Sequence, residues 1–403
     1  MQVYFYHTQD IQYCLRRMQD GEFPSHFLYG ACHLRDCGID VVWHRSPRRQ
    51  MSRLANAVRT AWQVMACRKR IDAVYATHYK GLELLIMLRA LGLFGKPIVV
   101  WHHQPVITPH NVLREWGGRL FYRGMDRMIF FSRKLVDDSL RSPKARKERL
   151  ILGHWGADLD FYDRVAAQRA HGGASVDGDM PACQDKDVCS HRQDTPADTR
   201  DVTSAARDTC SVSQDGTCGR TGFIATGKEM RDQHTLIEAF NRTGRALRLF
   251  IGINPDPSVP NPNLEAVNSC RPAGNIEVVK VCGLLPYEIA LEVDRAACVA
   301  ICCKPTRYTA GLTTLVEALA LGLPVICSRN AQMPVDIEAE GCGIAVDYGD
   351  VEGWCRAIEY MATHPEEARL MGEKGRAVAE SRFNDRQCAK EVAEVLRSVT
   401  GNA

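Results

Sequence analysis

Short apolar runs alternate with amphipathic segments along most of the chain. Apolar runs bounded by polar turns are typical of strands in parallel sheets, and apolar residues spaced three or four positions apart predict helices between them. The pattern therefore predicts an α/β protein with helices on both faces of its sheets. Six strands are expected in each half of the chain, at 3–6, 40–43, 73–76, 97–101, 128–131, 150–152, 223–226, 247–251, 276–281, 299–303, 324–327 and 344–346.

Residues 164–221 break this pattern. No Leu, Ile, Phe, Tyr or Trp occurs between His171 and Gly219, and Asp, Ser, Thr, Gly and Ala dominate. Such a segment buries too little apolar surface to offset its ordering entropy, which predicts a disordered insertion. The sequence thus predicts two doubly wound domains, 1–163 and 222–403, separated by the insertion 164–221. The last helix, 384–398, is expected to pack back on the first domain.

The insertion contains four cysteines and a histidine in the order C-x5-C-x-H and C-x7-C. These spacings match no common zinc pattern, so metal binding there is the less favoured of two readings. The residues concerned are Cys183, Cys189, His191, Cys210 and Cys218.

The composition indicates a cellular compartment and shows that charge is distributed unevenly along the chain. The chain has 17 cysteines, several of them inside apolar strands, where a free thiol behaves as a small hydrophobe. A reducing compartment, the cytoplasm, is expected, and the N-terminus lacks the basic leader and apolar core of a signal peptide. Residues 1–163 hold 25 Lys/Arg against 15 Asp/Glu, a net +10, whereas the remainder holds 26 against 33, a net −7. The basic half favours either an anionic partner, such as the inner face of a membrane, or a solvated surface.

Histidines follow five of the six front-half strands. Ligands of open α/β sheets bind beyond the carboxyl ends of the strands, so imidazoles gathered there favour a polar site. The residues are His7, His44, His78, the pair His102 and His103, and His154.

The most informative segment is 299–350. A buried strand ends at Lys304, a polar loop follows, and Gly311 opens a helix that carries Glu317 one turn in. The N–H groups and dipole at that helix start suit a phosphate, and glycine allows close approach of a ligand to the backbone. Glu317 would face the cleft, where a carboxylate can accept both hydroxyls of a ribose.

This segment resembles the signature of group-1, family-4 glycosyltransferases, in particular the run EALALGLPV at 317–325. The resemblance covers most of the back half and continues more weakly through KPIVVWHH and ILGHWGADLDFY in the front half. It implies the GT-B fold, in which two Rossmann-like domains face each other across a cleft. The front domain would bind the acceptor and the back domain a nucleotide-sugar donor. The implied enzyme is a hexosyltransferase that retains the anomeric configuration of the sugar.

One position departs from the signature. The family carries two glutamates eight positions apart, and the first would fall at Thr309. That glutamate normally contacts the donor sugar, so the substitution concerns sugar handling. The resemblance assigns donor contacts to Gly227, Cys282, Gly283, Thr309, Gly311, Leu312, Thr313 and Glu317.

A second site element is TGKEMRD at 226–232, directly after the first back-half strand. Lys228 and Arg231 fall where the family has a basic pair, and cations there would neutralise the leaving diphosphate. In the front half, His103 matches the family's cleft histidine, with His102 as its adjacent alternative and His78 on the acceptor side. The resemblance implies front-side displacement, in which the leaving phosphate takes the acceptor proton.

The segment 51–70 predicts a helix with Met51, Leu54, Val58, Trp62 and Met65 on one face, flanked by Arg and Lys. This stripe either docks on anionic lipid head groups or packs on the sheet, and packing is the default.

Several classes are disfavoured. No G-x-G-x-x-G follows a front-half strand, which argues against a nicotinamide dehydrogenase, and no aromatic–basic module indicates nucleic acid. No Asp-x-Asp follows a strand, so neither a metal nor another cofactor is expected. The expected partners are a nucleotide-sugar donor and a glycan, lipid-linked or small glycosylated acceptor. The alternatives are a GT-B epimerase or phosphorylase, and a nucleotide-sugar-binding subunit weakened by Thr309.

Overall fold

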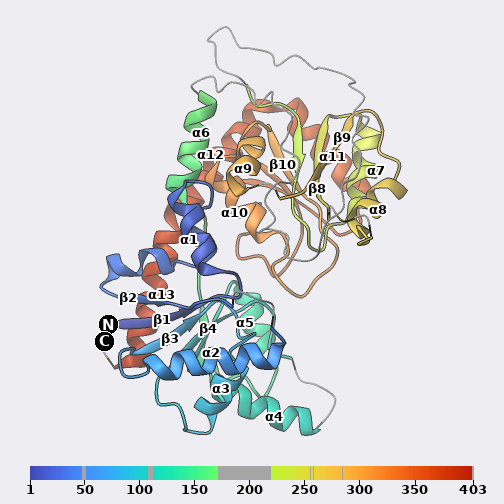
Figure 1. The fold of residues 1–403 in the computed structure, drawn as a ribbon. Helices are drawn as coiled ribbons and strands as arrows, with labels where there is room; N and C mark the ends of the chain where they lie inside the picture. Colours follow the sequence, from blue (N-terminus) through green and yellow to red (C-terminus); the bar gives the residue numbers. More distant parts are fainter. Residues whose placement is uncertain are drawn as a thin grey trace.

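The computed structural model describes residues 1–47, 51–107, 112–170, 219–254, 256, 258–283 and 285–401. The cysteine–histidine cluster and most of the expected insertion lie outside these residues. The described chain forms two six-stranded sheets in which every neighbouring pair of strands is parallel (Figure 1). All twelve strands lie where the apolar runs predicted them, within one or two residues at each end.

The first sheet has the order β2-β1-β3-β4-β5-β6. Its strands are β1 (Gln2–Tyr6), β2 (Asp40–Trp43), β3 (Ala73–Ala76), β4 (Ile98–His102), β5 (Arg127–Phe130) and β6 (Leu150–Leu152). The helical elements that accompany it are α1 (Ile11–Gln19), η1 (Ser25–Leu28), η2 (Ala31–Cys37), α2 (Arg53–Cys67), α3 (Glu83–Ala90), α4 (Val112–Arg123), α5 (Arg133–Leu140) and η3 (Lys147–Arg149). Helices α2, α3 and α4 pack side by side, so they form one layer over the sheet.

The second sheet has the order β12-β11-β10-β7-β8-β9. Its strands are β7 (Phe223–Ala225), β8 (Leu247–Gly252), β9 (Ile276–Val281), β10 (Cys298–Ile301), β11 (Val325–Ser328) and β12 (Gly343–Val346). The helices that follow are α7 (Gln233–Thr243), α8 (Pro262–Ser269), α9 (Pro286–Asp294), α10 (Leu312–Ala320), α11 (Val351–Thr363) and α12 (Pro365–Ser381). Contacts of α7 with α8 and α11, and of α10 with α12, define the two helical layers of this domain.

The chain crosses between the domains at two adjacent places. Ala157 pairs with Asn384 in a short parallel bridge, and Gly156 lies against Phe383, where an added Cβ would come within 1.8 Å of the backbone carbon. After the second crossing, α13 (Asp385–Thr400) returns to the first domain and packs on η2 and β3. The contact is close, because a Cβ on Gly30 would approach the Ala389 nitrogen to 2.8 Å. Both chain ends thus lie at the first domain (Figure 1).

Residues 164–170 correct the expected insertion. They belong to α6 (Leu159–Ala170), a helix that contacts α9 and α10 of the second domain. Val165 is fully buried there, so this part of the segment has an apolar anchor that the composition of the whole stretch concealed.

The orientation of α2 corrects a second expectation. The helix buries Ala57, Thr60, Ala61 and Val64 against the sheet and exposes most of the stripe of large residues instead, although Met65 is half-buried against the core. Leu54, Val58 and Trp62 are 75%, 50% and 71% exposed. The default prediction, that this stripe packs on the sheet, is wrong, because the small residues of the opposite face allow closer packing. Within the described ranges, no helix has both the length and the apolar character needed to cross a bilayer.

Candidate functional site

The loop after β7 holds a guanidinium in front of α10. Arg231 donates from Nε to the Thr226 carbonyl at 2.9 Å and from Nη2 to Oγ1 of Thr314, in the first turn of α10, at 3.2 Å. A third contact joins Nη1 to the Cys303 sulfur at 3.2 Å. Gly227 has φ +102°, and a Cβ there would lie 2.1 Å from Arg231 Nη2. The glycine is therefore required both by its backbone conformation and by the guanidinium packed against it.

The same loop is fixed to the end of β10. Asp232 N donates to the Cys302 carbonyl at 3.0 Å, and Lys304 N donates to the Met230 carbonyl at 2.8 Å. These bonds place the carboxyl ends of β7 and β10 next to each other, so Arg231 and the start of α10 belong to one site.

The first turn of α10 provides the second part of the site. Gly311, at φ +91°, precedes the helix, and a Cβ there would meet Ile301 Cγ2 at 2.6 Å. Leu312 is buried and its N–H donates to the Thr309 carbonyl at 3.1 Å, whereas the Thr313 side chain is exposed. The N–H groups that open a helix have no partner within it, and the dipole is positive there. Together with Arg231, this end of α10 is suited to bind a phosphate.

Lys228 lies on the other side of β7. Its side chain is exposed and runs along the end of β8, since a Cβ on Gly252 would lie 2.7 Å from Lys228 Cε. In the described residues no acidic group forms an ion pair with its ammonium. The structure therefore does not hold Lys228 and Arg231 together, and a long exposed side chain can still turn toward the site. Cys282 and Gly283, to which the resemblance assigns donor contacts, follow β9, the strand next to β8.

Glu317 lies at the junction of the two domains. Its carboxylate accepts a hydrogen bond from Tyr162 of α6, and its Oε1 is 4.0 Å from Nε2 of His26 in η1. The side chain is 18% exposed. Burial raises the pKa of Glu317 to about 7, partly offset by the Tyr162 hydrogen bond. Neither His26 nor Tyr162 belongs to a motif described above, so sequence reasoning passed over both.

Three histidines of the first domain gather at its sheet edge. The rings of His78 and His103 stack at 5.3 Å between centroids, and His103 Nε2 donates to the Thr77 carbonyl at 2.9 Å. Tyr29 lies 6.0 Å from the rings of both His7 and His103. Burial lowers the pKa of all three histidines, to about 4 for His7 and about 3 for His78. They are neutral near pH 7, so they offer hydrogen bonds rather than charge.

A carboxylate from the second domain faces this cluster. The charge of Glu229 acts to raise the pKa of His103 against the larger effect of burial, and Glu229 also accepts a hydrogen bond from Tyr308. Sequence reasoning passed over both residues, although Glu229 lies between Lys228 and Arg231.

His44, His102 and His154 lie outside the cluster of His7, His78 and His103. The expectation that histidines from five strands converge on one site is therefore wrong. His102 points to the opposite face of β4, because successive side chains alternate, and its ring packs near Tyr79, Tyr122 and Phe130. His44 binds the Tyr4 hydroxyl at 2.8 Å, and His154 binds Glu391 of α13 at 2.9 Å. His102 therefore lies on the other face of β4 from His103, and its acceptor-side role stays a prediction. No group of three or more His, Cys, Asp or Glu side chains in the described ranges is placed to hold a metal.

A protein-family comparison matches the second domain of the chain. Residues 220–378 match the sequence profile of glycosyl transferases group 1. The MMP alpha-(1->4)-mannosyltransferase of Mycolicibacterium hassiacum is 28% identical over 114 residues, which are 28% of this chain and 27% of that protein. The D-inositol 3-phosphate glycosyltransferase of Saccharomonospora viridis is 32% identical over 87 residues, 22% of this chain and 20% of that protein. The chain thus spans about a quarter or less of the length of these two relatives.

Solved structures resemble the whole chain. Sucrose-phosphate synthase from Thermosynechococcus elongatus has a TM-score of 0.65 at 15% identity, covering 100% of this chain and 99% of that one. Anabaena HepE in complex with UDP has 0.59 at 14%, covering 99% and 100%. WaaG, a glycosyltransferase involved in lipopolysaccharide biosynthesis, has 0.55 at 13%, covering 98% and 99%. The expected GT-B fold is confirmed.

Proposed function

We propose that this chain is a glycosyltransferase that moves a hexosyl group from a nucleotide-sugar donor to a glycan, lipid-linked or small glycosylated acceptor. The observation that carries the proposal is the fixed guanidinium of Arg231 at the opening of α10, with Glu317 farther along the same helix. A diphosphate at the helix start would meet Arg231, and the ribose of the same nucleotide would meet the carboxylate. The similarity of residues 220–378 to group 1 glycosyl transferases supports this reading.

Arg231 would serve the chemical step by stabilising the charge that develops on the leaving diphosphate, with Lys228 as a second, mobile cation. This arrangement needs no divalent cation. The neutral cluster of His7, His78 and His103 would bind hydroxyl groups of the sugars by hydrogen bonds. His103, the best placed against the second domain, would lie closest to the reacting centre. We infer retention of anomeric configuration from the family resemblance, with the leaving phosphate accepting the proton of the acceptor.

We also propose that the first domain binds an anionic membrane surface, which would present a lipid-linked acceptor. The outward stripe of α2, defined as Leu54, Val58 and Trp62, is flanked by Arg53 and Arg59, and the first domain is basic overall. Apolar side chains framed by cations are suited to the interface of an anionic bilayer. Helix α2 begins near the histidine cluster, since Arg53 binds Glu83 and its charge acts to lower the pKa of His78. A lipid-linked acceptor could therefore enter the histidine cluster from that surface.

The experiment is a melting-temperature panel with UDP, GDP, ADP and their sugars, with and without a chelator. Binding to the folded state raises the melting temperature by mass action. One nucleotide should stabilise the parent, and stabilise Glu317→Ala and Lys228→Ala less, regardless of chelator. Lys374→Ala, at an exposed position of α12, is the matched control and should behave like the parent. Absence of any stabilisation at millimolar concentration, or its loss with chelator, would contradict the proposal.

The departure at Thr309 favours one alternative, a binding subunit that has lost turnover. A donor-hydrolysis assay on the stabilising nucleotide-sugar separates the two. Release of nucleoside diphosphate supports the transferase, and binding without release supports the subunit.

A further inference from the structure

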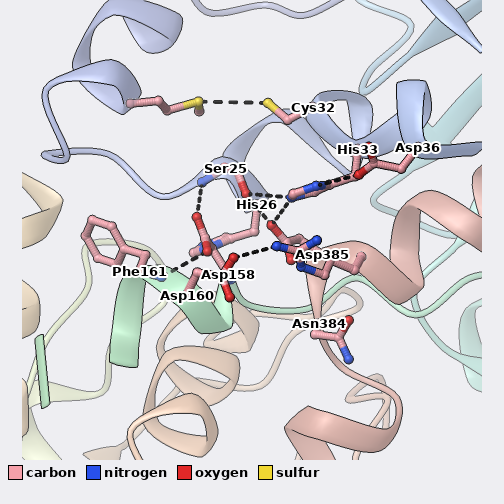
Figure 2. A network of polar contacts seen from close by, with 12 residues as sticks. Ser25, His26, Cys32, His33, Asp36, Asp158, Asp160, Phe161, Asn384 and Asp385 are labelled. Atoms are coloured by element: carbon pink, nitrogen blue, oxygen red, sulfur yellow. Dashed lines mark hydrogen bonds and ion pairs between the residues drawn. The ribbon is translucent and has the colours of Figure 1, made fainter. Parts of the chain in front are cut away.

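His26 is a buried side chain attached to the crossing between the domains. It is 0% exposed, its Nδ1 accepts from the Asp158 N–H at 3.1 Å, and its carbonyl accepts from Trp155 Nε1 at 3.0 Å. Figure 2 shows it beside Asp158, whose carboxylate binds the Ser25 N–H at 2.8 Å. Because Nδ1 is an acceptor, the proton of the neutral ring sits on Nε2.

That proton has no acceptor. Among the described residues, Nε2 of His26 has no hydrogen-bond partner. A buried donor left unpaired is destabilising, so a fully buried one calls for an explanation. The atom it approaches is Oε1 of Glu317 at 4.0 Å, beyond hydrogen-bond distance but within reach of a small movement.

The two residues belong to different domains. His26 lies in η1 beside the first sheet, and Glu317 lies in α10 of the second domain. Tyr162 of α6 joins them, because it donates to Glu317 and its ring stacks over that of His26 at 6.1 Å and 27°. A slight approach of the domains would therefore bring Nε2 to the carboxylate.

We propose that His26 is a positioning residue for the donor, whose Nε2–H bonds Glu317 when the ribose hydroxyls engage that carboxylate. The bond would fix the orientation of the carboxylate and link the occupied donor site to the crossing at Asp158. The inference rests on the proposed function, in which Glu317 accepts the ribose. A purely structural role leaves the buried Nε2–H without a partner.

Two substitutions distinguish the roles of the two ring nitrogens of His26. His26→Asn retains a polar group near the Nδ1 position and loses the Nε2 donor, whereas His26→Gln retains a donor near the Nε2 position. Affinity is measured by calorimetry for UDP and for 2′,3′-dideoxy-UDP, with GDP or ADP pairs used if the melting panel selects another base. Melting temperatures report folding of each variant.

His26→Asn should weaken UDP binding about 10- to 100-fold, the range for a hydrogen bond to a charged group. It should leave dideoxy-UDP binding unchanged, and His26→Gln should bind UDP within about threefold of the parent. Parent-like UDP binding by His26→Asn, or equal weakening toward both nucleotides, would overturn the inference. If His26→Asn does not fold, His26→Gln decides: retained preference for UDP over its dideoxy form supports the inference, and loss of that preference overturns it. A parent that binds no nucleotide contradicts the proposed function itself, a failure visible without any variant.

Discussion

Arg169 and Arg220 bind the two oxygens of one buried carboxylate. Arg169 Nε lies 2.7 Å from Oδ2 of Asp294, and Arg220 Nη2 lies 2.5 Å from Oδ1. Arg169 is near the end of α6 and Arg220 precedes β7, so the two ends of the segment 171–218 are held at one point of α9. The chain on either side of this segment is thus already joined through Asp294.

Deletion of residues 172–219 should therefore preserve folding, since both arginines and Asp294 remain. Calorimetry should give a melting temperature within a few degrees of the parent. Asp294→Ala is the informative control, because it leaves two cations facing a buried gap and should lower the free energy of unfolding by about 3 kcal/mol or more. A large drop in melting temperature on deletion would show that the segment contributes to the core.

Gly227→Ala should impair nucleotide binding through Arg231. The added Cβ collides with the guanidinium, so the cation must leave the start of α10. We expect about tenfold or greater loss of affinity for the stabilising nucleotide, together with a backbone cost of about 1–2 kcal/mol. Gly244→Ala is the matched control, since Gly244 has φ +66° at the end of α7 with nothing within 4 Å of its Cβ. It should lower stability similarly and leave affinity unchanged; equal losses of affinity would assign the effect to strain alone.

Nucleotide affinity should fall as pH decreases through about 7. Burial raises the pKa of Glu317 from 4.5 to about 7, and only the ionised carboxylate accepts two hydroxyls. The unliganded protein should correspondingly lose stability as pH rises from 4.5 through 7, because the folded state binds the proton more tightly than the unfolded chain. Calorimetric titration from pH 6 to 8 checks the first expectation. Glu317→Gln is the control, because it keeps the titration of the ligand's phosphate and removes that of the carboxylate. If its nucleotide affinity changes with pH as steeply as that of the parent, Glu317 is excluded as the cause.

The pair His33–Asp385 should stabilise the domain crossing at low pH. His33 Nε2 lies 2.9 Å from Asp385 Oδ2 (Figure 2), and that hydrogen bond raises the pKa of His33 above 6.5. Its contribution is complete below pH 6.5 and is lost as pH rises through the higher folded value. His33→Ala should thus lower the free energy of unfolding by about 1 kcal/mol at pH 6 and by less at pH 9. Denaturant titrations at the two pH values test this, and a constant difference would rule out the charged pair.

The stripe of α2 should bind anionic vesicles. Sedimentation with vesicles containing phosphatidylglycerol should pellet the parent, and Leu54→Ser with Trp62→Ser should weaken partitioning about tenfold or more, from the loss of two apolar side chains. Leu370→Ser, at a 43% exposed leucine of α12, is the control and should not change binding. Equal binding of the parent to neutral and anionic vesicles would contradict the expectation that anionic lipid attracts the basic residues beside the stripe.

The sequence allowed accurate prediction of the strands and of the loop at Gly227 and Gly311, because buried parallel strands and helix starts leave strong local patterns. It could not separate His102 from His103, since the choice depends on which face of β4 each residue occupies. The stripe of α2 was similarly ambiguous: two faces of one helix were both apolar enough to pack, and Ala57 and Ala61 fitted more closely. Sequence reasoning did not identify His26, because its approach to Glu317 arises only when the two domains are assembled.

The return of α13 has a consequence for synthesis of the protein. Residues near Gly30 and Tyr75 pack against a helix that leaves the ribosome only after the whole second domain. The first domain therefore cannot complete its core while it emerges, and its uncovered η2 face must wait through translation of more than two hundred further residues. Until α13 is released, that face remains an uncovered apolar surface of the kind that chaperones bind on nascent chains.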